Sequence, residues 1–341
     1  MDKKAAIFWI KKDAVGLKGK PLMLEKVMFC PLLEWMGEVL AASGIGRILL
    51  LCEKEWAEEL KACLPNHEVI VATENQEEAE QKFLEENGPC MRFERPVLPF
   101  HGQVGEFSTF KEMMDASLYC RDDIMKMYVM SGVAVIDPGN TYIDPRVSIA
   151  PGAVILPGTI IRGRSVIAAD CEIGPNAMIT DSEIGEGSVV NQSQVSGSVV
   201  GRNVRIGPFA YIRPGCNVAD GAKIGDFVEL KNSSIGEKTS VAHLTYIGDS
   251  DVGAGVNFGC GTVTTNYDGD KKYRCTIGDR SFIGCNVNLI APVTVGEGAY
   301  IAAGTTVTKE VPADSLAIGR AEQTVKEGWA AKRRAIKHSK Y

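Results

Sequence analysis

Residues Ile143 to Ile179 read IDPRVS-IAPGAV-ILPGTI-IRGRSV-IAADCE-IGPNAM-I, and this stretch decides the fold. An isoleucine opens every one of these hexapeptides without a break in register. The six-residue period is then interrupted. It resumes from Val200 to Leu230 and again from Ile277 to Val307. A period of six fits neither an α-helix nor an alternating β-strand, but it is typical of a solenoid in which each hexapeptide supplies one short strand and one turn. β-Branched residues suit the stacked interior of such a solenoid, and glycines suit its corners.

Three hexapeptides make one coil of a three-sided column. A coil therefore takes about 18 residues and rises about 4.8 Å, so Ile143 to Val311 predicts roughly nine coils. We expect a parallel β-helix over residues 136–318. The repeat itself does not determine handedness, since ordinary crossover connections are right-handed.

The first 106 residues have a different pattern. Strand candidates at 5–10, 48–52 and 69–72 alternate with helix candidates at 31–42, 53–63 and 77–86. This alternation predicts βαβ units and a small α/β domain over residues 1–106. Residues 92–105 have the composition of a linker, 107–135 are expected to join the domains through a helix at 107–130, and 319–341 form a C-terminal arm. The basic cluster in that arm predicts a solvated terminus or, alternatively, an anion contact.

Composition excludes several classes of function. A net charge of −6 argues against a bulk nucleic-acid binder. Ten scattered cysteines with no Cys-x-x-Cys pair and no signal peptide predict reduced thiols in a cytoplasmic protein. No apolar run approaches the ~18 residues of a membrane span, and four scattered histidines offer few ligands for a metal, so neither is expected.

Two cations are stacked on consecutive coils. Ile212 and Leu230 are interior positions one coil apart, so Arg213 and Lys231, which follow them, should point outward side by side. Like charges at that spacing repel unless an anion lies between them. A phosphate would fit, with arginine as a bidentate partner and lysine as a point charge. The alternative is two solvated surface cations.

A histidine and an interruption of the repeat follow these cations. His243 is the only histidine inside the repeat and lies near a corner, where it is either structural or a general base active near neutral pH. The repeat holds at Phe258 and Thr264, fails at Asp270 and resumes at Ile277. Residues 266–274 must therefore leave the coil as a loop, which is either a binding element or a solvated insertion.

Several strings in this region are specific. They are IGPFAYIRPG (206–215), DFVELK (226–231), HLTYIGD (243–249), TNYDG (265–269), APVTVG (291–296), IAAGTTVT (301–308) and KEGW (326–329). From about residue 129 to 329 the sequence resembles the acetyltransferase half of the bifunctional N-acetylglucosamine-1-phosphate uridyltransferase/glucosamine-1-phosphate N-acetyltransferase family. The resemblance implies a left-handed β-helix, a homotrimer whose sites draw residues from neighbouring chains, and a bacterial cytoplasmic enzyme. It also implies acetyl transfer from acetyl-CoA to glucosamine 1-phosphate without a metal, in the synthesis of UDP-N-acetylglucosamine for peptidoglycan and the cell wall.

The resemblance also implies roles for individual residues. His243 would be the general base, oriented by Glu229. The remaining residues would bind the sugar phosphate (Arg213, Lys231, Tyr246, Asn257 and Lys272) or acetyl-CoA (Cys260, Asn266, Tyr267, Cys285, Ala303 and Arg320). Cys260 and Cys285 stand where the family usually has alanine and serine. Either thiol could in principle form an acyl-enzyme, but direct attack by the amine needs no such relay.

The opening of the chain resembles the start of the uridyltransferase half of the same family, in the frame PLMLEKV (21–27). The family's glycine-rich phosphate loop corresponds to Lys11–Val15, which has no glycine, and its catalytic lysine corresponds to Leu22. The domain is also too short for the complete fold. We therefore expect a degenerate domain without uridyltransferase activity.

Three alternative functions stay open. The acceptor could be another amino-sugar phosphate such as galactosamine 1-phosphate. The β-helix could be a non-catalytic scaffold, against which the set formed by His243, the two cations and the loop argues. Full bifunctionality is opposed by the degenerate N-terminal motifs.

Overall fold

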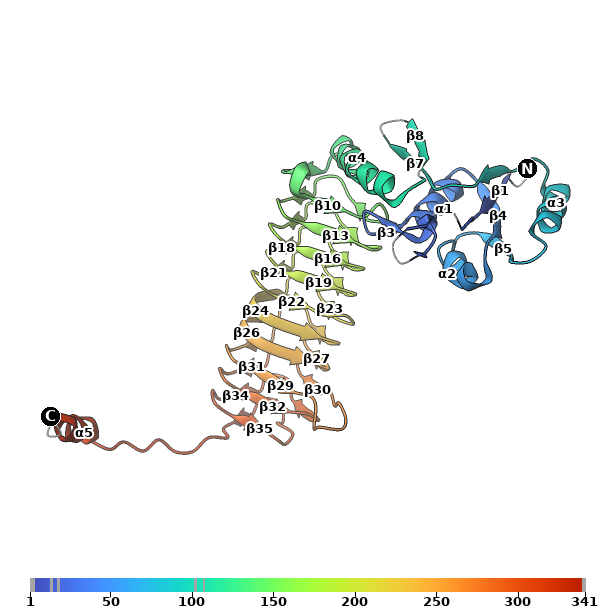
Figure 1. Cartoon of the computed structure of the whole chain (residues 1–341). Coiled ribbons are helices and arrows are strands. Elements are labelled where there is room, and N and C mark those ends of the chain that lie inside the picture. The colour runs from blue at the N-terminus through green and yellow to red at the C-terminus, as the bar shows by residue number, and fades with distance from the viewer. Residues whose placement is uncertain (1–3, 13–14, 17–18, 101–102, 107, 339–341) are drawn as a thin grey trace.

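The structure is a computed structural model that describes residues 4–12, 15–16, 19–100, 103–106 and 108–338 (Figure 1). A small α/β domain is followed by a tall three-sided column and an extended arm that ends in helix α5 (Trp329–His338). The fold is the expected left-handed parallel β-helix preceded by an α/β domain. No helix among the described residues is both long and apolar enough to cross a membrane.

The α/β domain is built on a four-stranded parallel sheet of order β5-β4-β1-β6. Helices cover both faces, because one core cluster joins the sheet to α1 and α2 and another joins it to α3 through Phe83. The elements are β1 (Lys4–Trp9), η2 (Leu22–Leu24), β2 (Lys26–Val27), β3 (Cys30–Pro31), α1 (Leu32–Ala42), β4 (Ile45–Leu51), η3 (Lys54–Trp56), α2 (Ala57–Ala62), β5 (Glu68–Ala72) and α3 (Gln76–Asn87). The predicted alternation of strands and helices is confirmed.

The linker expected at 92–105 is wrong. This segment contains the end of β6 (Met91–Phe93), which adds the fourth strand to the sheet, and an antiparallel pair formed by β7 (Val97–Phe100) and β8 (Gln103–Glu106). Its prolines and glycines concealed short strands, since such residues weaken strand patterns without excluding edge strands.

Helix α4 (Phe110–Met130) connects the cores of the two domains. It begins at a capping box in which Thr109 and Glu112 exchange side-chain and backbone hydrogen bonds. Met113 near its start packs into the α/β core, whereas Tyr128 near its end packs into the β-helix core and donates to the carbonyl of Val147 at 2.6 Å. The helix therefore ties the column to the domain before it.

The column has three ladders of short parallel strands, each strand pairing with its equivalent one coil away. The first ladder comprises β9 (Ala134–Val135), β12 (Val154–Ile155), β15 (Glu172–Ile173), β18 (Val189–Val190), β21 (Arg205–Ile206), β28 (Asn257–Phe258), β31 (Phe282–Ile283), β34 (Tyr300–Ile301) and β36 (Leu316–Ala317). The second comprises β10 (Tyr142–Ile143), β13 (Ile160–Arg162), β16 (Met178–Thr180), β19 (Gln194–Ser196), β22 (Tyr211–Ile212), β29 (Val263–Thr265), β32 (Asn288–Ile290) and β35 (Thr306–Val307). The third comprises β11 (Ser148–Ile149), β14 (Val166–Ile167), β17 (Glu183–Ile184), β20 (Val199–Val200), β23 (Asn217–Val218), β25 (Ser234–Ile235), β27 (Ser250–Val252), β30 (Cys275–Ile277) and β33 (Val293–Val295). The short helix η4 (Pro138–Asn140) precedes β10.

Two longer strands, β24 (Lys223–Lys231) and β26 (Ser240–Gly248), run from the first ladder around a corner into the second. They lie next to each other, and His243 is on β26. With these two strands counted, the first, second and third ladders have eleven, ten and nine strands, close to the roughly nine coils expected.

The six-residue period is interrupted where one side of a coil is one residue shorter. Ile179 is followed by the next interior residue at Ile184, and Ile247 by Val252, five positions later in each case. The corners between them are turned by Asp181 and Asp249, whose φ angles are 46° and 48°. Asp and Asn tolerate this left-handed conformation better than most residues do, so the shorter sides do not interrupt the stacked interior.

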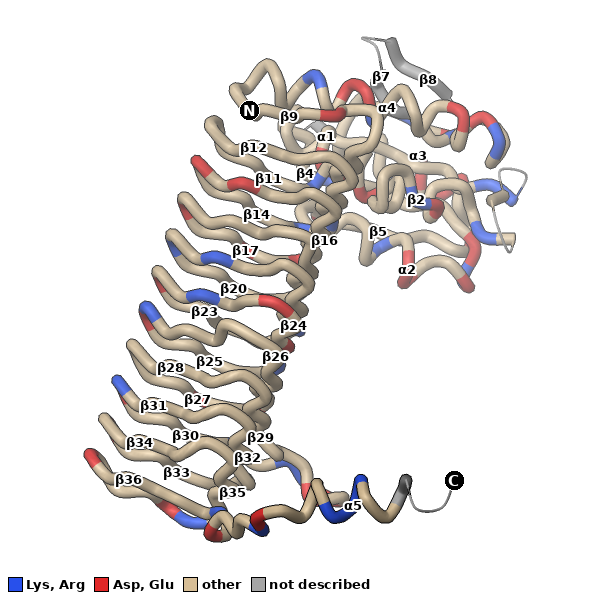
Figure 2. The backbone as a smooth tube through the Cα atoms, turned by 90° about the vertical axis from the view of Figure 1, so that its left-hand side faces the viewer, with Lys and Arg blue, Asp and Glu red and all other residues tan. Residues whose placement is uncertain are grey.

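The α/β domain lies beside the upper coils (Figure 2), and charged side chains connect the two. Arg146 contacts Asp144 at 2.7 Å and Glu34 of α1 at 3.0 Å, and its side chain is 17% exposed while that of Asp144 is fully buried. Arg164 also reaches Glu34, at 2.9 Å, but its side chain is 53% exposed. The hydrogen bond to Asp144 raises the pKa of Arg146 above its ordinary value, so the guanidinium stays charged.

We predict that Arg146→Met lowers the free energy of unfolding by about 3 kcal/mol, because it leaves the buried Asp144 carboxylate without its cation. Arg164→Met is the matched control and should cost no more than about 1 kcal/mol, because its ion pairs are solvated. Urea unfolding followed by circular dichroism would measure both. Equal effects of the two substitutions would show that burial does not govern this contact.

Candidate active site

The three edges of the column carry different residues. We call edge A the corner between the first and second ladders, where Phe227 and Leu244 lie, and edge B the corner between the second and third, where Asn232 and Asp249 lie. Edge C is the corner between the third ladder and the first. The coils stack in register, so residues one coil apart on one edge are direct neighbours.

Several predicted site residues follow one another down edge A. The amide of Gly261 donates to the carbonyl of Leu244 at 2.9 Å, which places Cys260 one coil below His243. The amide of Asn286 donates to Cys260 at 2.8 Å and brings Cys285 to the next coil. The amide of Gly304 donates to Cys285 at 2.8 Å, and Arg320 donates to the carbonyl of Ala303. Edge A thus joins His243, Cys260, Cys285, Ala303 and Arg320 in one column.

His243 is held by Asp226, which pairs with it across β24 and β26. The Nδ1 atom of His243 lies 2.7 Å from Oδ1 of Asp226, and this hydrogen bond lowers the pKa of Asp226. If Nδ1 carries the proton that it donates to the carboxylate, Nε2 has a free lone pair. The expectation that Glu229 orients His243 is wrong for contacts within the chain, because Glu229 binds Arg213 instead, at 2.8 Å.

The two stacked cations are joined by a third. Arg213 and Lys231 lie one coil apart, as predicted, with the amide of Arg213 donating to Leu230 at 2.9 Å. Lys272, from the extruded loop, contacts Lys231, and both the hydrogen bond with Lys231 and its positive charge lower the pKa of Lys272. Three cationic side chains therefore converge beside the second ladder, where an anion would stabilise all of them.

Carboxylates partly neutralise the three cations. The expectation that the stacked cations would repel each other took no account of these carboxylates. Glu229 pairs with Arg213, and Asp249 lies 3.4 Å from Lys231. Burial works to raise the pKa of Asp249, but hydrogen bonds from Asn232 and Asn266 and the charge of Lys231 outweigh it, so the pKa is lowered. The ionised Asp249 fixes both the lysine and the start of the loop.

A glycine below the cations allows two polar side chains to approach the backbone closely. Gly248 is the next residue in the stack after Arg213 and Lys231, and a Cβ added there would lie 2.3 Å from the Tyr246 hydroxyl and 2.8 Å from the Asn266 amide nitrogen. A side chain at 248 would therefore displace both groups. Tyr246 itself lies between Glu229 and Val263 on the second ladder, so it borders the cationic group.

The loop leaves the coil where the interruption of the repeat predicted. It lies between β29 and β30, and a bridge pairs Tyr267 with Lys272 across it. The Tyr267 ring is 55% exposed, and its hydroxyl donates to the carbonyl of Gly269 at 2.6 Å. Asn266, by contrast, is buried against Asp249 on edge B.

Not all predicted site residues come together within one chain. Asn257 lies on the first ladder, between Ser240 and Phe282, and edge A separates it from the cations. Asn266 and Tyr267 follow β29 at edge B, whereas the other predicted acetyl-CoA residues line edge A. The predicted set is therefore divided between two edges of the column.

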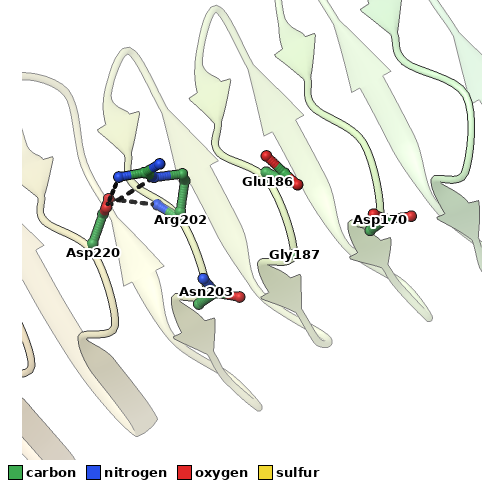
Figure 3. Close-up of a pocket in the computed structure, with 6 residues that line it drawn as sticks. All are labelled: Asp170, Glu186, Gly187, Arg202, Asn203 and Asp220. Carbon is green, nitrogen blue, oxygen red and sulfur yellow. Dashed lines mark hydrogen bonds and ion pairs between the residues drawn. The ribbon is translucent and has the colours of Figure 1, made fainter.

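A hollow of about 370 Å³ on edge C takes no part in this arrangement (Figure 3). It is lined by Asp170, Glu186, Asp220 and Arg202. Arg202 forms an ion pair with Asp220 at 2.8 Å. Its acidic lining does not suit a phosphorylated substrate. Across the described parts of the chain, no group of three or more His, Cys, Asp or Glu side chains is arranged to hold a metal ion.

Sequence analysis missed Asp226 and Asp249. Each lies about one coil from its partner, because Asp226 precedes His243 by 17 positions and Asp249 follows Lys231 by 18. A search for oppositely charged residues at coil spacing would have found both. Only the spacing of 17 between Asp226 and His243 departs from three hexapeptides, so a strict six-residue period concealed that pair alone.

Comparisons with known proteins give the class first. Residues 197–232 and 274–309 match the family described as bacterial transferase hexapeptide (six repeats). The column is thus a hexapeptide-repeat β-helix of the kind found in bacterial transferases.

More specific similarity covers the C-terminal two-thirds of the chain. Over 214 residues it is 51% identical to the bifunctional protein GlmU of Clostridium acetobutylicum, which covers 63% of this chain and 47% of that protein. Over 221 residues it is 48% identical to GlmU of Brevibacillus brevis, covering 65% of this chain and 48% of that protein. The chain spans about half the length of these relatives and is similar to them in this part.

One solved structure similar to part of this chain is LpxA, a UDP-N-acetylglucosamine acyltransferase from Bacteroides fragilis. It is 20% identical, covers 58% of this chain and 76% of its own, and has a TM-score of 0.37. We draw no functional argument from it.

We predict that Lys231→Met raises the pKa of Lys272 towards that of an ordinary lysine, because it removes the neighbour that lowers it. The pH dependence of amine labelling at Lys272, followed by mass spectrometry, should shift to higher pH. Lys271→Met, which removes an adjacent exposed lysine on the same loop, should leave the labelling curve unchanged. An unchanged curve in Lys231→Met would mean that the two lysines are not coupled.

Proposed function

We propose that this protein is an acyltransferase that transfers an acetyl group from acetyl-CoA to the amine of glucosamine 1-phosphate. The observations that carry the proposal are the cationic group Arg213, Lys231 and Lys272 beside the second ladder and, on edge A of the same coils, a histidine whose Nδ1 is held by a carboxylate. Identity of 48–51% to proteins named GlmU supports the choice of substrates.

The sugar phosphate binds to the cations. A phosphate between Arg213, Lys231 and Lys272 replaces part of the neutralisation by Glu229 and Asp249, and it favours the charged form of Lys272. The absence of a side chain at Gly248 leaves the Tyr246 hydroxyl in place beside the cations, where it can contact the sugar. These contacts position the amine, which is the main contribution that binding makes to the rate.

His243 supplies the general base. Asp226 accepts the Nδ1 proton, so Nε2 takes a proton from the substrate amine as the amine attacks the thioester carbonyl. The tetrahedral intermediate collapses with cleavage of the carbon–sulfur bond, and the CoA thiolate takes up a proton. The acetyl group passes directly to nitrogen, and no metal takes part.

Acetyl-CoA lies along edge A, beside Cys260, Cys285 and Ala303, with Arg320 near its phosphates. Asn266 and Tyr267 would be supplied by edge B of a neighbouring chain, which explains why the predicted cofactor residues are divided between two edges. Asn257 likewise becomes part of a site shared between chains. Phe209, Phe227 and Leu244 on edge A are 55–59% exposed, and their apolar surface is suited to burial by such a neighbour. The proposed assembly is a homotrimer, and light scattering should give the mass of three chains.

Two further readings are weaker. An acceptor of different stereochemistry, such as galactosamine 1-phosphate, would use the same groups. A non-catalytic scaffold has no use for an Asp226–His243 pair together with a group of three cations.

We predict that His243→Ala lowers kcat for CoA release with glucosamine 1-phosphate by about 10²- to 10⁴-fold, because it removes the base. Asp226→Asn should lower kcat less and raise the fraction of the other imidazole tautomer, which ¹⁵N NMR of labelled histidine reports. Glu229→Gln, the matched control, should change mainly KM for the sugar phosphate through Arg213. Normal kcat in His243→Ala would refute the proposed base.

We also predict that the protein releases no pyrophosphate from UTP and N-acetylglucosamine 1-phosphate. Lys11–Val15 offers no glycine-rich phosphate loop, and the side chain of Leu22 is buried rather than presented to a substrate. A coupled pyrophosphate assay would check this on a sample that is active in CoA release. The CoA release shows that the protein in the sample is folded. UTP-dependent turnover would show that the N-terminal domain retains the second activity.

A further inference from the structure

Two cysteines are placed differently from the other eight. Cys260 and Cys285 are exposed, whereas seven of the remaining cysteines are buried and Cys90 is half-buried. Burial raises the pKa of those eight thiols, to about 11 for Cys63 and Cys120. The reactive thiolate is therefore suppressed at the other positions, and reaction from solvent is directed to Cys260 and Cys285.

These two residues occupy equivalent positions in consecutive coils. Phe258 pairs with Ile283 at the ends of β28 and β31, and each cysteine follows two residues later. The amide of Gly259 donates to Ile283 at 2.7 Å, and the amide of Asn286 donates to Cys260 at 2.8 Å, so hydrogen bonds flank the pair on both sides. Both cysteines lie at the same point of a turn on edge A.

The spacing of the coils suits a disulfide bond. Neighbouring strands lie about 4.8 Å apart, and disulfides join Cα atoms separated by about 4.4–6.8 Å. Equivalent positions on a stacked edge direct their side chains the same way, so the two sulfur atoms can meet after a small rotation about χ1. The backbone hydrogen bonds between coils on either side of the two cysteines hold their backbones in this arrangement.

We propose that Cys260 and Cys285 form a reversible intrachain disulfide, and that this edge is a site of oxidative modification. Hydrogen peroxide is the oxidant: each thiol first loses its proton, one thiolate attacks a peroxide oxygen to give a sulfenic acid and hydroxide, and the second thiolate displaces a second hydroxide to form the sulfur–sulfur bond. The two hydroxides take up the two protons. Two thiols and one peroxide thus give one disulfide and two waters. A small dithiol reverses the reaction by thiol–disulfide exchange.

Disulfide formation controls access to the site if edge A binds acetyl-CoA, and this consequence rests on the proposed function. The bond would remove both thiol groups and place a rigid bridge directly below His243, on the path proposed for the thioester. A shift of the thioester by about 1 Å is enough to lower the rate up to about 100-fold.

Thiol counting and peptide mapping test the modification independently of activity. The reduced native protein should show two fast-reacting thiols per chain, and stoichiometric hydrogen peroxide should remove both with loss of the mass of two hydrogen atoms. Trypsin places Cys260 in peptide 239–271 and Cys285 in peptide 281–309. A non-reduced digest should contain these two peptides joined, and dithiothreitol should separate them.

Cys260→Ala and Cys285→Ala are the matched variants, and neither should give the joined peptides. Peroxide should lower CoA release by the wild type at least about tenfold, reversibly, whereas each variant should change little relative to its own reduced form. Oxygen addition to one cysteine without a cross-link, or a cross-link between chains on a non-reducing gel, would overturn the proposal. Joined peptides in a protein that shows no acetyl transfer when reduced would refute the proposed function alone.

Discussion

The in-register stacking of coils is the constraint on which the rest of the structure depends. Each coil donates its backbone amides to the coil next to it, so a residue has as neighbours the residues one coil before and one coil after it. The interior is filled by Ile, Val and Leu at these equivalent positions, and the outer surface inherits the same order. A functional group on such a surface needs no loop to position it, because the spacing between strands fixes where the next group lies.

The candidate site is built by this rule. Asp226 meets His243, Arg213 lies beside Lys231, and Cys260 lies beside Cys285 because each pair is one coil apart. Only the loop that carries Lys272 departs from the rule, and it returns to contact Lys231. The shortened corner at Asp249 adds a buried carboxylate at the point where the lysine and the loop meet. Rigid stacking thus brings together groups that are distant in sequence.

Much of the fold could be predicted because the isoleucine period reports the interior directly. The positions of the loop and of the stacked cations follow from the same period. What failed was the pairing of charges: Glu229 was expected at His243, but the register aligns Asp226 with the histidine and Glu229 with Tyr211 and Tyr246. Coils vary in length, and Ile179 pairs with Val195 whereas Ile161 pairs with Ile179, so a fixed count of residues does not identify contacts. The short strands at 91–106 were hidden because three- and four-residue strands rich in proline and glycine leave little pattern.

The most direct test of the account is the position of glucosamine 1-phosphate in an experimental structure of the complex. The account predicts its phosphate between Arg213, Lys231 and Lys272, with its amine within hydrogen-bond reach of Nε2 of a His243 from the same or a neighbouring chain. A phosphate bound on edge C, or an amine that no His243 of the assembly approaches, would contradict it.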